Sequence, residues 1–375
     1  MAAAICWACG LFVFYVLAGY PLCLAVLARL RPRPWQRRFV PMPVTVLMPV
    51  RNGERWLRDK LESLLALDYP ADLLRILVLS DGSTDATAAI ARSYAGRGVE
   101  CQELPPGGKG AALNAGLASV QEGALLMTDV RQQLSRNSLR DLVACLGDPA
   151  VGVASGELIL RDGASGETRN VGLYWKYEKF IRRRQALLGS VPGATGAIYV
   201  IRRELARPLP PDILLDDVFL PVGAIRQGYR VVFEDRAIAY DDAATLDAEF
   251  GRKVRTQGGV WQLLRLEPWL LSPANPIWLH VLSHKAGRLL LPFALLAFLL
   301  ASPWTPAPWP ALLLGGQGLF YGLAFLDSLL REGSPLKRAT GPLRTFVTLL
   351  LAAAAGIRVF WTPARDLWRP PASRL

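Results

Sequence analysis

The stretch that most constrains the fold is a short apolar run that breaks into polar residues, Arg75 to Asp85. Its apolar part, Ile76 to Leu79, is typical of a strand covered on both faces inside a parallel sheet. Ligands of open α/β sheets collect outside the carboxyl ends of such strands, where Asp81 stands before a turn-forming glycine. The polar residues also suit a simple turn and helix cap. The stretch thus predicts one strand of a ligand-binding sheet, with the turn as the alternative.

Strand-like and helix-like segments alternate from Val44 to about Arg265. This alternation indicates the α/β class and favours a parallel sheet with helices on both faces. The expected strands are residues 44–48, 76–79, 99–104 and 124–127, and the expected helices are residues 54–67, 86–94 and 111–119.

Long uncharged runs lie towards both ends of the chain. Hydrophobic residues make up 52% of the sequence although 20% are charged, so the apolar residues are segregated. Residues 2–28 are long enough to cross a bilayer as a helix, and they lack the basic start of a signal peptide. Residues 289–304 and 309–326 predict a transmembrane hairpin. Residues 345–357 are short for a crossing, and the pattern leaves open whether they span or re-enter.

Basic residues gather beside these apolar runs, within a net charge of +12. Five arginines between residues 29 and 38 precede the first acidic residue, Glu54, so the positive-inside rule predicts that the main domain faces the cytosol. This clustering fits an anionic membrane surface, and no motif with interleaved aromatics suggests nucleic-acid binding. The five cysteines include no second Cys-x-x-Cys pair that would complete a metal site with Cys6 and Cys9, and they predict no disulfide framework.

The predicted organisation is that of a multi-pass protein of the cell (inner) membrane. A helix lying in the membrane interface is expected because residues 276–288 mix tryptophan, histidine and basic residues with aliphatic ones. The expected parts are an N-terminal transmembrane helix (1–30), a basic linker (31–43), a cytosolic domain (44–272), the interfacial helix (273–288), a C-terminal transmembrane region of two or three segments (289–361) and a tail (362–375).

Polar residues also follow the expected strand at 44–48, at the same sheet edge as Asp81. They begin after Pro49 and include Asn52 and Glu54. A nucleotide base and ribose can sit between these two strand ends, with Asp81 accepting hydrogen bonds. The alternative for Asn52 and Glu54 is an ordinary helix N-terminus.

Two further segments suit a diphosphate and a metal ion. In Gly107 to Asn114, glycines let backbone amides approach a ligand and Lys109 supplies a positive charge, although the Walker spacing is absent. Asp129 ends another expected strand, and one carboxylate with water and phosphate oxygens suffices for magnesium. The alternatives are a flexible loop with a solvated lysine and a turn aspartate.

In their order and separation, these motifs resemble those of family 2 glycosyltransferases, which move a sugar from a nucleotide diphosphate. The resemblance covers residues 44–265 and the membrane-edge segment 283–285, and it is highly specific as a set. It implies the Rossmann-like GT-A fold and inverting transfer. The matching segments are Pro49–Glu54, Asp81–Asp85, Lys109–Asn114, Asp129, Gly193–Tyr199, Leu215–Val218 and Arg252–Thr256.

The resemblance implies a role for each matching position. Asp217 would be the general base that deprotonates an acceptor hydroxyl, and Asp216 beside it would raise its pKa. Helix capping is the alternative for this pair. Asp129 would hold Mg²⁺ or Mn²⁺, and Asp81 would bind the base of the donor nucleotide. The implied donor contacts are Pro49, Asn52, Glu54, Asp81, Lys109, Asn114, Arg252 and Arg255, and the implied acceptor contacts are Gly196, Trp261 and Gln262.

Two segments depart from the family pattern. Arg131 replaces the second acid of the usual Asp-x-Asp metal motif. In the Gln-x-x-Arg-Trp motif of processive members, Arg252 stands for Gln and Thr256 for Trp, whereas Arg255 is retained. Trp261 and Gln262 follow five residues later and can serve the aromatic and polar roles. We therefore rank single transfer above processive polymerisation. Arg252 and Arg255 share a helix face that can reach a diphosphate, and a solvated basic face next to lipid is the alternative.

The sequence predicts a membrane-anchored inverting glycosyltransferase. Its expected donor is a UDP-sugar, and its expected acceptor is a lipid-linked or growing glycan at the cytosolic membrane face. The alternative is a catalytically silent nucleotide-sugar binder that regulates a polysaccharide export complex. Arg131 favours that alternative, whereas the retention of Asp81 and Asp217 opposes it. A transporter is disfavoured because the apolar runs carry no charge in their interiors.

Overall fold

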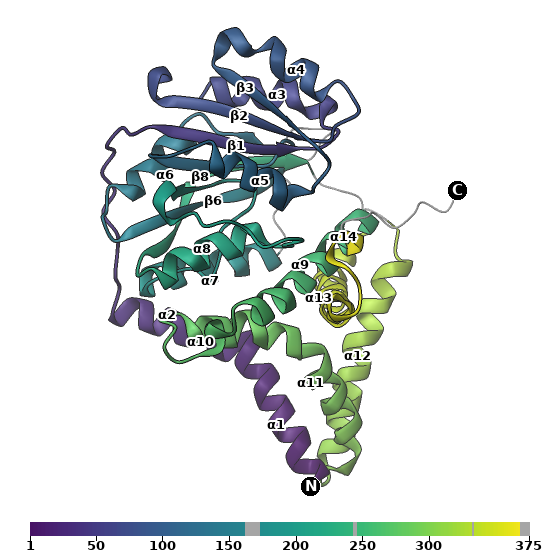
Figure 1. The fold of residues 1–375 in the computed structure, drawn as a ribbon. Helices are drawn as coiled ribbons and strands as arrows, with labels where there is room; N and C mark the ends of the chain where they lie inside the picture. The colour runs from purple at the N-terminus through teal and green to yellow at the C-terminus, as the bar shows by residue number, and fades with distance from the viewer. Residues whose placement is uncertain (162–172, 243–245, 332–333, 368–375) are drawn as a thin grey trace.

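The structure is a computed structural model that describes residues 1–161, 173–242, 246–331 and 334–367. An α/β domain lies at one end of the molecule and long apolar helices extend from it (Figure 1). Of the predicted tail, residues 368–375 lie outside the described residues.

The sheet of the α/β domain is mixed, because strands beyond the four expected ones add antiparallel pairs to the predicted parallel part. Among the described residues its strand order is β3-β2-β1-β4-β7-β6-β8-β5. The first four strands in this order are parallel, as expected, but β7 runs antiparallel to both β4 and β6. The strands are β1 (Val44–Val50), β2 (Leu74–Asp81), β3 (Val99–Leu104), β4 (Ala124–Met127), β5 (Gln133–Leu134), β6 (Val151–Arg161), β7 (Tyr199–Arg202) and β8 (Arg230–Asp242).

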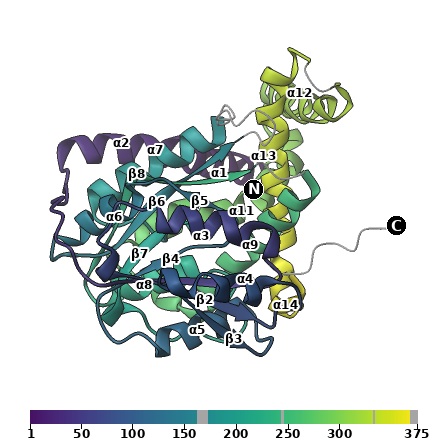
Figure 2. The same cartoon turned by 90° about the horizontal axis from the view of Figure 1, so that it is seen from above.

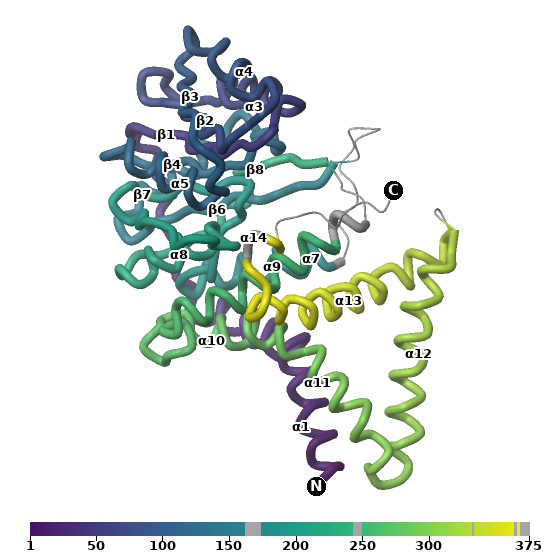
Figure 3. The backbone as a smooth tube through the Cα atoms, turned by 45° about the vertical axis from the view of Figure 1, so that its right-hand side comes forward, coloured from purple at the N-terminus to yellow at the C-terminus, as the bar shows by residue number. Residues whose placement is uncertain are grey.

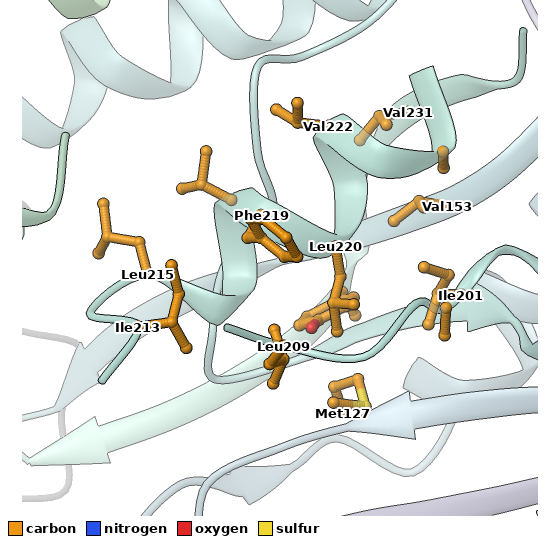
Figure 4. Packing of buried hydrophobic residues seen from close by; sticks show 14 of the residues in the cluster. Met127, Val153, Ile201, Leu209, Ile213, Leu215, Phe219, Leu220, Val222 and Val231 are labelled. Atoms are coloured by element: carbon orange, nitrogen blue, oxygen red, sulfur yellow. The ribbon is translucent and has the colours of Figure 1, made fainter. Parts of the chain in front are cut away.

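Helices cover both faces of the sheet. Along β1 the side chains alternate, so Leu47 packs on one face while Val46 and Met48 pack on the other. The first face is covered by α5 (Lys109–Ala118) and α8 (Asp216–Arg226), and the second by α3 (Glu54–Leu65), α4 (Thr87–Ser93) and α6 (Ser138–Leu146). Figure 4 shows α8 residues such as Leu220 packed against sheet residues such as Ile201.

The register of the strands brings distant segments to one edge of the sheet. β1 and β2 pair in parallel, and so do β1 and β4, so their carboxyl ends lie side by side. β7 starts at this edge because Tyr199 pairs with Met127, the last residue of β4. The segments that follow Val50, Ser80 and Met127 therefore meet there.

Two further helices link the α/β domain to the apolar helices. They are α7 (Leu173–Leu188) and α9 (Leu246–Leu266). α7 contacts α2 (Tyr20–Leu30), and the Tyr177 hydroxyl donates to the carbonyl of Leu17 at 3.0 Å. α9 packs against α13 (Lys337–Gly356), where Gly258 and Gly356 let the two backbones approach closely. The N-terminal and C-terminal apolar helices are thus both tied to the domain.

Within the described residues, four helical stretches are long and apolar enough to cross a membrane. They are Ala2–Leu30, Trp278–Trp304, Trp309–Leu329 and Lys337–Phe360. The first comprises α1 (Ala2–Phe14), a π-helical turn and α2, and the second comprises α10 (Trp278–His280), a π-helical turn (Val281–Ala286) and α11 (Gly287–Ala301). The predicted interfacial helix therefore runs from Trp278 into the next segment without a break.

The last apolar helix, α13, lies crosswise to the others. Figure 1 shows it nearly end-on, whereas α1, α11 and α12 (Trp309–Leu329) run down the page, and Figure 2 shows it lengthwise. Figure 3 shows α13 leading from the end of α12 back beneath the α/β domain. The segment whose course the sequence left open thus returns to the domain and packs on α9.

Candidate active site

Carboxylates from separate parts of the chain converge on one lysine. Lys109 opens α5, and its Nζ lies 3.0 Å from Asp129 Oδ1 and 3.1 Å from Asp216 Oδ1. Burial alone would lower the pKa of this lysine, but Asp129, Asp216 and Asp217 outweigh burial and hold its pKa above the usual value. Lys109 is therefore a permanent cation among these acids.

Asp217 lies beside this ion pair at the start of α8. Its Oδ2 accepts a hydrogen bond from the backbone N–H of Gly196 at 3.1 Å. Burial and the neighbouring Asp216 raise the pKa of Asp217 to about 6, although Lys109 and Lys285 oppose the rise. A carboxyl group with this pKa is ionised at neutral pH and still takes up a proton readily, as a general base requires.

Tyr199 reaches the acids from β7. Its side chain is fully buried, and its hydroxyl has no hydrogen-bond partner among the described residues. Burial raises the pKa of Tyr199 well above its usual value, and Asp216, Asp217 and Asp129 add to the rise. The hydroxyl therefore lies within electrostatic reach of all three carboxylates. The sequence marked Tyr199 only as the end of a motif, without a role.

Two arginines bring positive charge towards the acids. Burial lowers the pKa of Arg255 on α9, whereas Asp129 and Asp217 oppose that effect. Arg182 on α7 donates to the hydroxyls of Thr195 at 2.5 Å and Ser155 at 2.8 Å, and Asp217 also lies within its electrostatic reach. In the sequence, Arg182 belongs to a run of three arginines that suits a sugar face or an anionic lipid, with the basic outer side of a packed helix as the alternative. Its place behind the segment of Asp217 was not expected.

Asp81 holds the glycine-rich loop that precedes Lys109. Its carboxylate accepts the backbone N–H of Gly107 at 2.7 Å and that of Gly108 at 3.0 Å. Gly108 has a φ of +83°, which side chains with a Cβ rarely adopt. The Asp81 carboxylate thus positions the start of α5, and it is buried in this arrangement.

The other polar residues assigned to the donor are also engaged within the protein. Asn52 Oδ1 accepts the N–H of Thr84 at 2.8 Å, and Glu54 Oε2 accepts the N–H of Ala86 at 2.9 Å. These bonds join the chain after β1 to the chain after β2. Pro49 lies inside β1, paired with Leu79.

Asn114 makes a pair of bonds far along the chain. Its side chain donates to the carbonyl of Leu209 at 2.9 Å and accepts the N–H of the same residue at 2.8 Å. These bonds attach α5 to the segment that leads to the acidic pair. The described polar contacts of Asn114 therefore lie within the scaffold.

Trp261 and Gln262 on α9 also hold the scaffold. Gln262 accepts the N–H of Leu214 at 2.9 Å and donates to the carbonyl of Asp212 at 3.0 Å, just before the acidic pair. The Trp261 ring packs against Phe360 with centroids 5.9 Å apart. Arg252, one α9 turn before Thr256, accepts the Thr256 hydroxyl on its carbonyl at 2.9 Å.

A lysine on α3 that was not expected from the sequence holds the loop that carries Asp129. Lys60 is fully buried and donates to the Thr128 hydroxyl at 2.7 Å and to the Gln132 carbonyl at 2.6 Å. Burial lowers the pKa of Lys60 to about 7, with Asp129 partly opposing. A signal existed, because Lys60 interrupts the apolar stripe formed by Leu57, Leu61 and Leu64 on α3.

Arg131, which replaces the second metal acid, is paired elsewhere. Its guanidinium lies 2.6 Å from Asp241 Oδ2, and the Gln132 amide donates to the same oxygen at 2.8 Å. Within the described residues, no group of three or more histidine, cysteine, aspartate or glutamate side chains is arranged to hold a metal. The partly exposed Asp129 carboxylate still suits a hard divalent cation that takes its other ligands from phosphate and water.

Comparison with known proteins gives consistent matches along the chain. Residues 45–209 match the glycosyl transferase family 2, and residues 129–361 match the glycosyl transferase family group 2. A beta-monoglucosyldiacylglycerol synthase of Synechocystis sp. is 23% identical over 88% of this chain and 74% of its own length. The probable glycosyltransferase YdaM of Bacillus subtilis is 24% identical over 55% of this chain and 52% of its own.

A solved structure matches nearly the whole chain. It is a mannosyltransferase from Pyrobaculum calidifontis in complex with GDP-Man and Mn²⁺, with a TM-score of 0.75 and 21% sequence identity. The match covers 96% of this chain and 99% of that one. The two proteins therefore share a fold that includes the apolar helices.

Proposed function

The chain belongs to glycosyl transferase family 2 and is a GT-A transferase that uses a nucleotide-sugar donor, and we propose that it transfers the sugar with inversion to a hydroxyl acceptor at the cytosolic membrane face. The expected donor class is a UDP-sugar. The expected acceptor is a lipid-linked or growing glycan.

The observation that carries this proposal is the convergence of Lys109, Asp129 and Asp217 at the carboxyl edge of the sheet. A diphosphate leaving group needs positive charge, and an acceptor hydroxyl needs a base. Lys109 is a permanent cation at this edge, and Asp217 is a carboxylate with a pKa of about 6. This edge of the sheet therefore supplies both the positive charge and the base within one group of side chains.

The proposed reaction uses these residues in distinct roles. Asp217 accepts the proton of the acceptor hydroxyl as its oxygen attacks the anomeric carbon opposite the diphosphate. Lys109 and Arg255 offset the charge that develops on the leaving diphosphate. A divalent cation held at Asp129 would supply further stabilisation of that charge when bound. Gly196 and Arg182 hold the segment that positions Asp217.

A membrane-linked acceptor fits the surroundings of Asp217. Lys285 belongs to the apolar stretch Trp278–Trp304 and lies within electrostatic reach of Asp217. The base is thus near the junction with the apolar helices, where a lipid-linked hydroxyl would arrive. The Synechocystis relative is named as a synthase of a glucosylated diacylglycerol, which supports a lipid acceptor for this chain.

The test is nucleotide release by the purified protein in lipid from a panel of UDP-, GDP- and dTDP-sugars, with membrane extract as acceptor. Parallel reactions contain Mg²⁺, Mn²⁺ or chelator, and the anomeric configuration of the product is read by NMR. We expect release from one donor class, dependent on metal, with an inverted product. A retained configuration would refute the inverting mechanism. No release from any donor would favour the regulatory nucleotide-sugar binder instead.

A further inference from the structure

We infer that Asp216 is the second carboxylate of a divalent-metal site with Asp129, and that the Lys109 ammonium occupies the position between them which the metal takes. This assignment rests on the proposed function and goes beyond it, because in the proposed function Asp216 only raises the pKa of Asp217. Asp216 would thus take the part of the second metal-binding acid, whose usual position holds Arg131 in this chain.

The first support is the geometry of Lys109. Its Nζ contacts Asp129 Oδ1 at 3.0 Å and Asp216 Oδ1 at 3.1 Å, so the two carboxylate oxygens face one cationic centre. Asp129 follows β4 and Asp216 opens α8, so the tertiary fold aims both carboxylates at the same point. Mg²⁺ is commonly bound through one or two carboxylates together with the phosphates of a substrate, which this pair of acids can provide for.

The second support is an unused donor beside the carboxylates. The Tyr199 hydroxyl is fully buried and has no hydrogen-bond partner within the described part of the chain. A buried hydroxyl without a partner is unfavourable, and a group supplied from outside the described chain would satisfy it. Tyr199 pairs with Met127, two residues before Asp129, so Tyr199 stands at the same edge of the sheet as that carboxylate.

The third support is the ion pair of Arg131, the residue at the usual position of the second metal-binding acid. Arg131 is held by Asp241, so its charge is matched away from Lys109. The loop between Thr128 and Gln132 is fixed at both ends by Lys60, which keeps Asp129 in place. The loop of Asp129 is thus held in place, and the second acid comes from α8.

Charge balance explains why a divalent cation would displace the Lys109 ammonium from between the two carboxylates. An arriving diphosphate adds negative charge to a site that already holds Asp129, Asp216 and Asp217. A divalent cation between two carboxylates neutralises more of this charge than one ammonium does, and the released Lys109 can then pair with a phosphate. The metal is therefore expected to bind weakly alone and tightly together with the nucleoside diphosphate.

The experiment measures Mn²⁺ binding by the full-length protein in lipid, without acceptor, by the loss of the free Mn²⁺ signal in electron paramagnetic resonance. UDP and GDP are each supplied as the diphosphate. We expect Asp129→Asn and Asp216→Asn each to weaken Mn²⁺ binding by about tenfold or more, because each removes a charged ligand. Asp217→Asn, one residue along, is the matched control and should bind Mn²⁺ as the wild type does.

Lys109→Met tests the exchange of cations. Without nucleotide, this variant should bind Mn²⁺ more tightly than the wild type, because the competing ammonium is gone. Unchanged or weaker binding would overturn the exchange. Circular dichroism and thermal melting confirm that each variant is folded, and Asp216→Ser provides a second removal of the carboxylate.

The outcomes separate this inference from the proposed function. If Asp216→Asn and Asp216→Ser bind Mn²⁺ like the wild type while the wild type transfers sugar, the metal assignment is wrong and the function stands. If the wild type releases nucleotide from no donor but loses Mn²⁺ binding in both Asp216 variants, the metal assignment stands and the proposed function fails.

Discussion

Two neighbouring regions of the sheet edge use polar side chains in opposite ways. In the strand-end scaffold, formed by Asn52, Glu54, Asp81 and Asn114, the polar side chains bond to backbone groups of adjoining loops. In the acid cluster, formed by Lys109, Asp129, Asp216 and Asp217, like charges are pressed together and the nearby Tyr199 hydroxyl is without a hydrogen-bond partner in the described chain.

This difference separates stability from chemistry. A side chain whose bonds are satisfied within the protein stabilises the fold, and losing it costs free energy of unfolding. A side chain held with a perturbed pKa among like charges is typical of a catalytic site. Substitutions in the scaffold should therefore change the melting temperature, and substitutions in the acid cluster should change the rate.

The largest expected effect is that of Asp217→Asn. Removing the base should lower kcat by roughly 10²- to 10⁴-fold, the usual contribution of general base catalysis. The melting temperature should stay near that of the wild type, since the amide can still accept the Gly196 N–H. Product formation and thermal melting are measured together. Asp59→Asn, an exposed carboxylate on α3, serves as control. A wild-type rate of sugar transfer in Asp217→Asn would show that Asp217 is not the general base.

The pH profile should report the same carboxyl group. Burial and Asp216 raise the pKa of Asp217 to about 6, and the base works only when deprotonated. The value of kcat/KM should therefore be half its maximum near pH 6, level off about one pH unit above that and approach a tenfold fall per pH unit below it. Steady-state rates between pH 4.5 and 8 measure this limb, with melting curves at each pH as control. An acid limb centred at pH 4 would contradict the shifted pKa.

Asn114→Leu should have the opposite signature. It removes both bonds to the Leu209 backbone, so the free energy of unfolding should fall by about 1–3 kcal/mol. The kcat of the protein that remains folded should be unchanged. Denaturant unfolding followed by circular dichroism measures the loss. Asn114→Asp keeps the acceptor for the Leu209 N–H but sets a carboxylate oxygen against the Leu209 carbonyl, so it should not restore the stability. A large fall in kcat without loss of stability would move Asn114 into the catalytic machinery.

The smallest expected effect is that of Glu54→Gln, because the amide oxygen can still accept the Ala86 N–H. Its stability should change by less than about 1 kcal/mol, and the KM for the donor should not change. Glu54→Ala, which removes the acceptor, should cost about 1 kcal/mol. Donor titrations and melting curves on both variants measure this. A tenfold higher donor KM in Glu54→Gln would make Glu54 a donor contact, as the family resemblance implied.

Local patterns were sufficient for much of the architecture. The expected strands 99–104 and 124–127 coincide with β3 and β4, and the other expected strands and helices differ from the structure by a few residues at their ends. The apolar runs correspond to helices long enough to cross a membrane. Such features follow from hydrophobic periodicity and length, which a short window of sequence contains.

The sequence by itself determined which acids stand at strand ends and helix starts, because those positions follow from local apolar runs and their sudden ends. Only the tertiary structure decided their partners. The bonds between Asn114 and Leu209 join residues 95 positions apart, and Arg131 pairs with Asp241 across 110. The antiparallel course of β7 and the burial of Lys60 are likewise products of packing. Such contacts depend on how distant elements meet in space, and no periodicity within one segment records them.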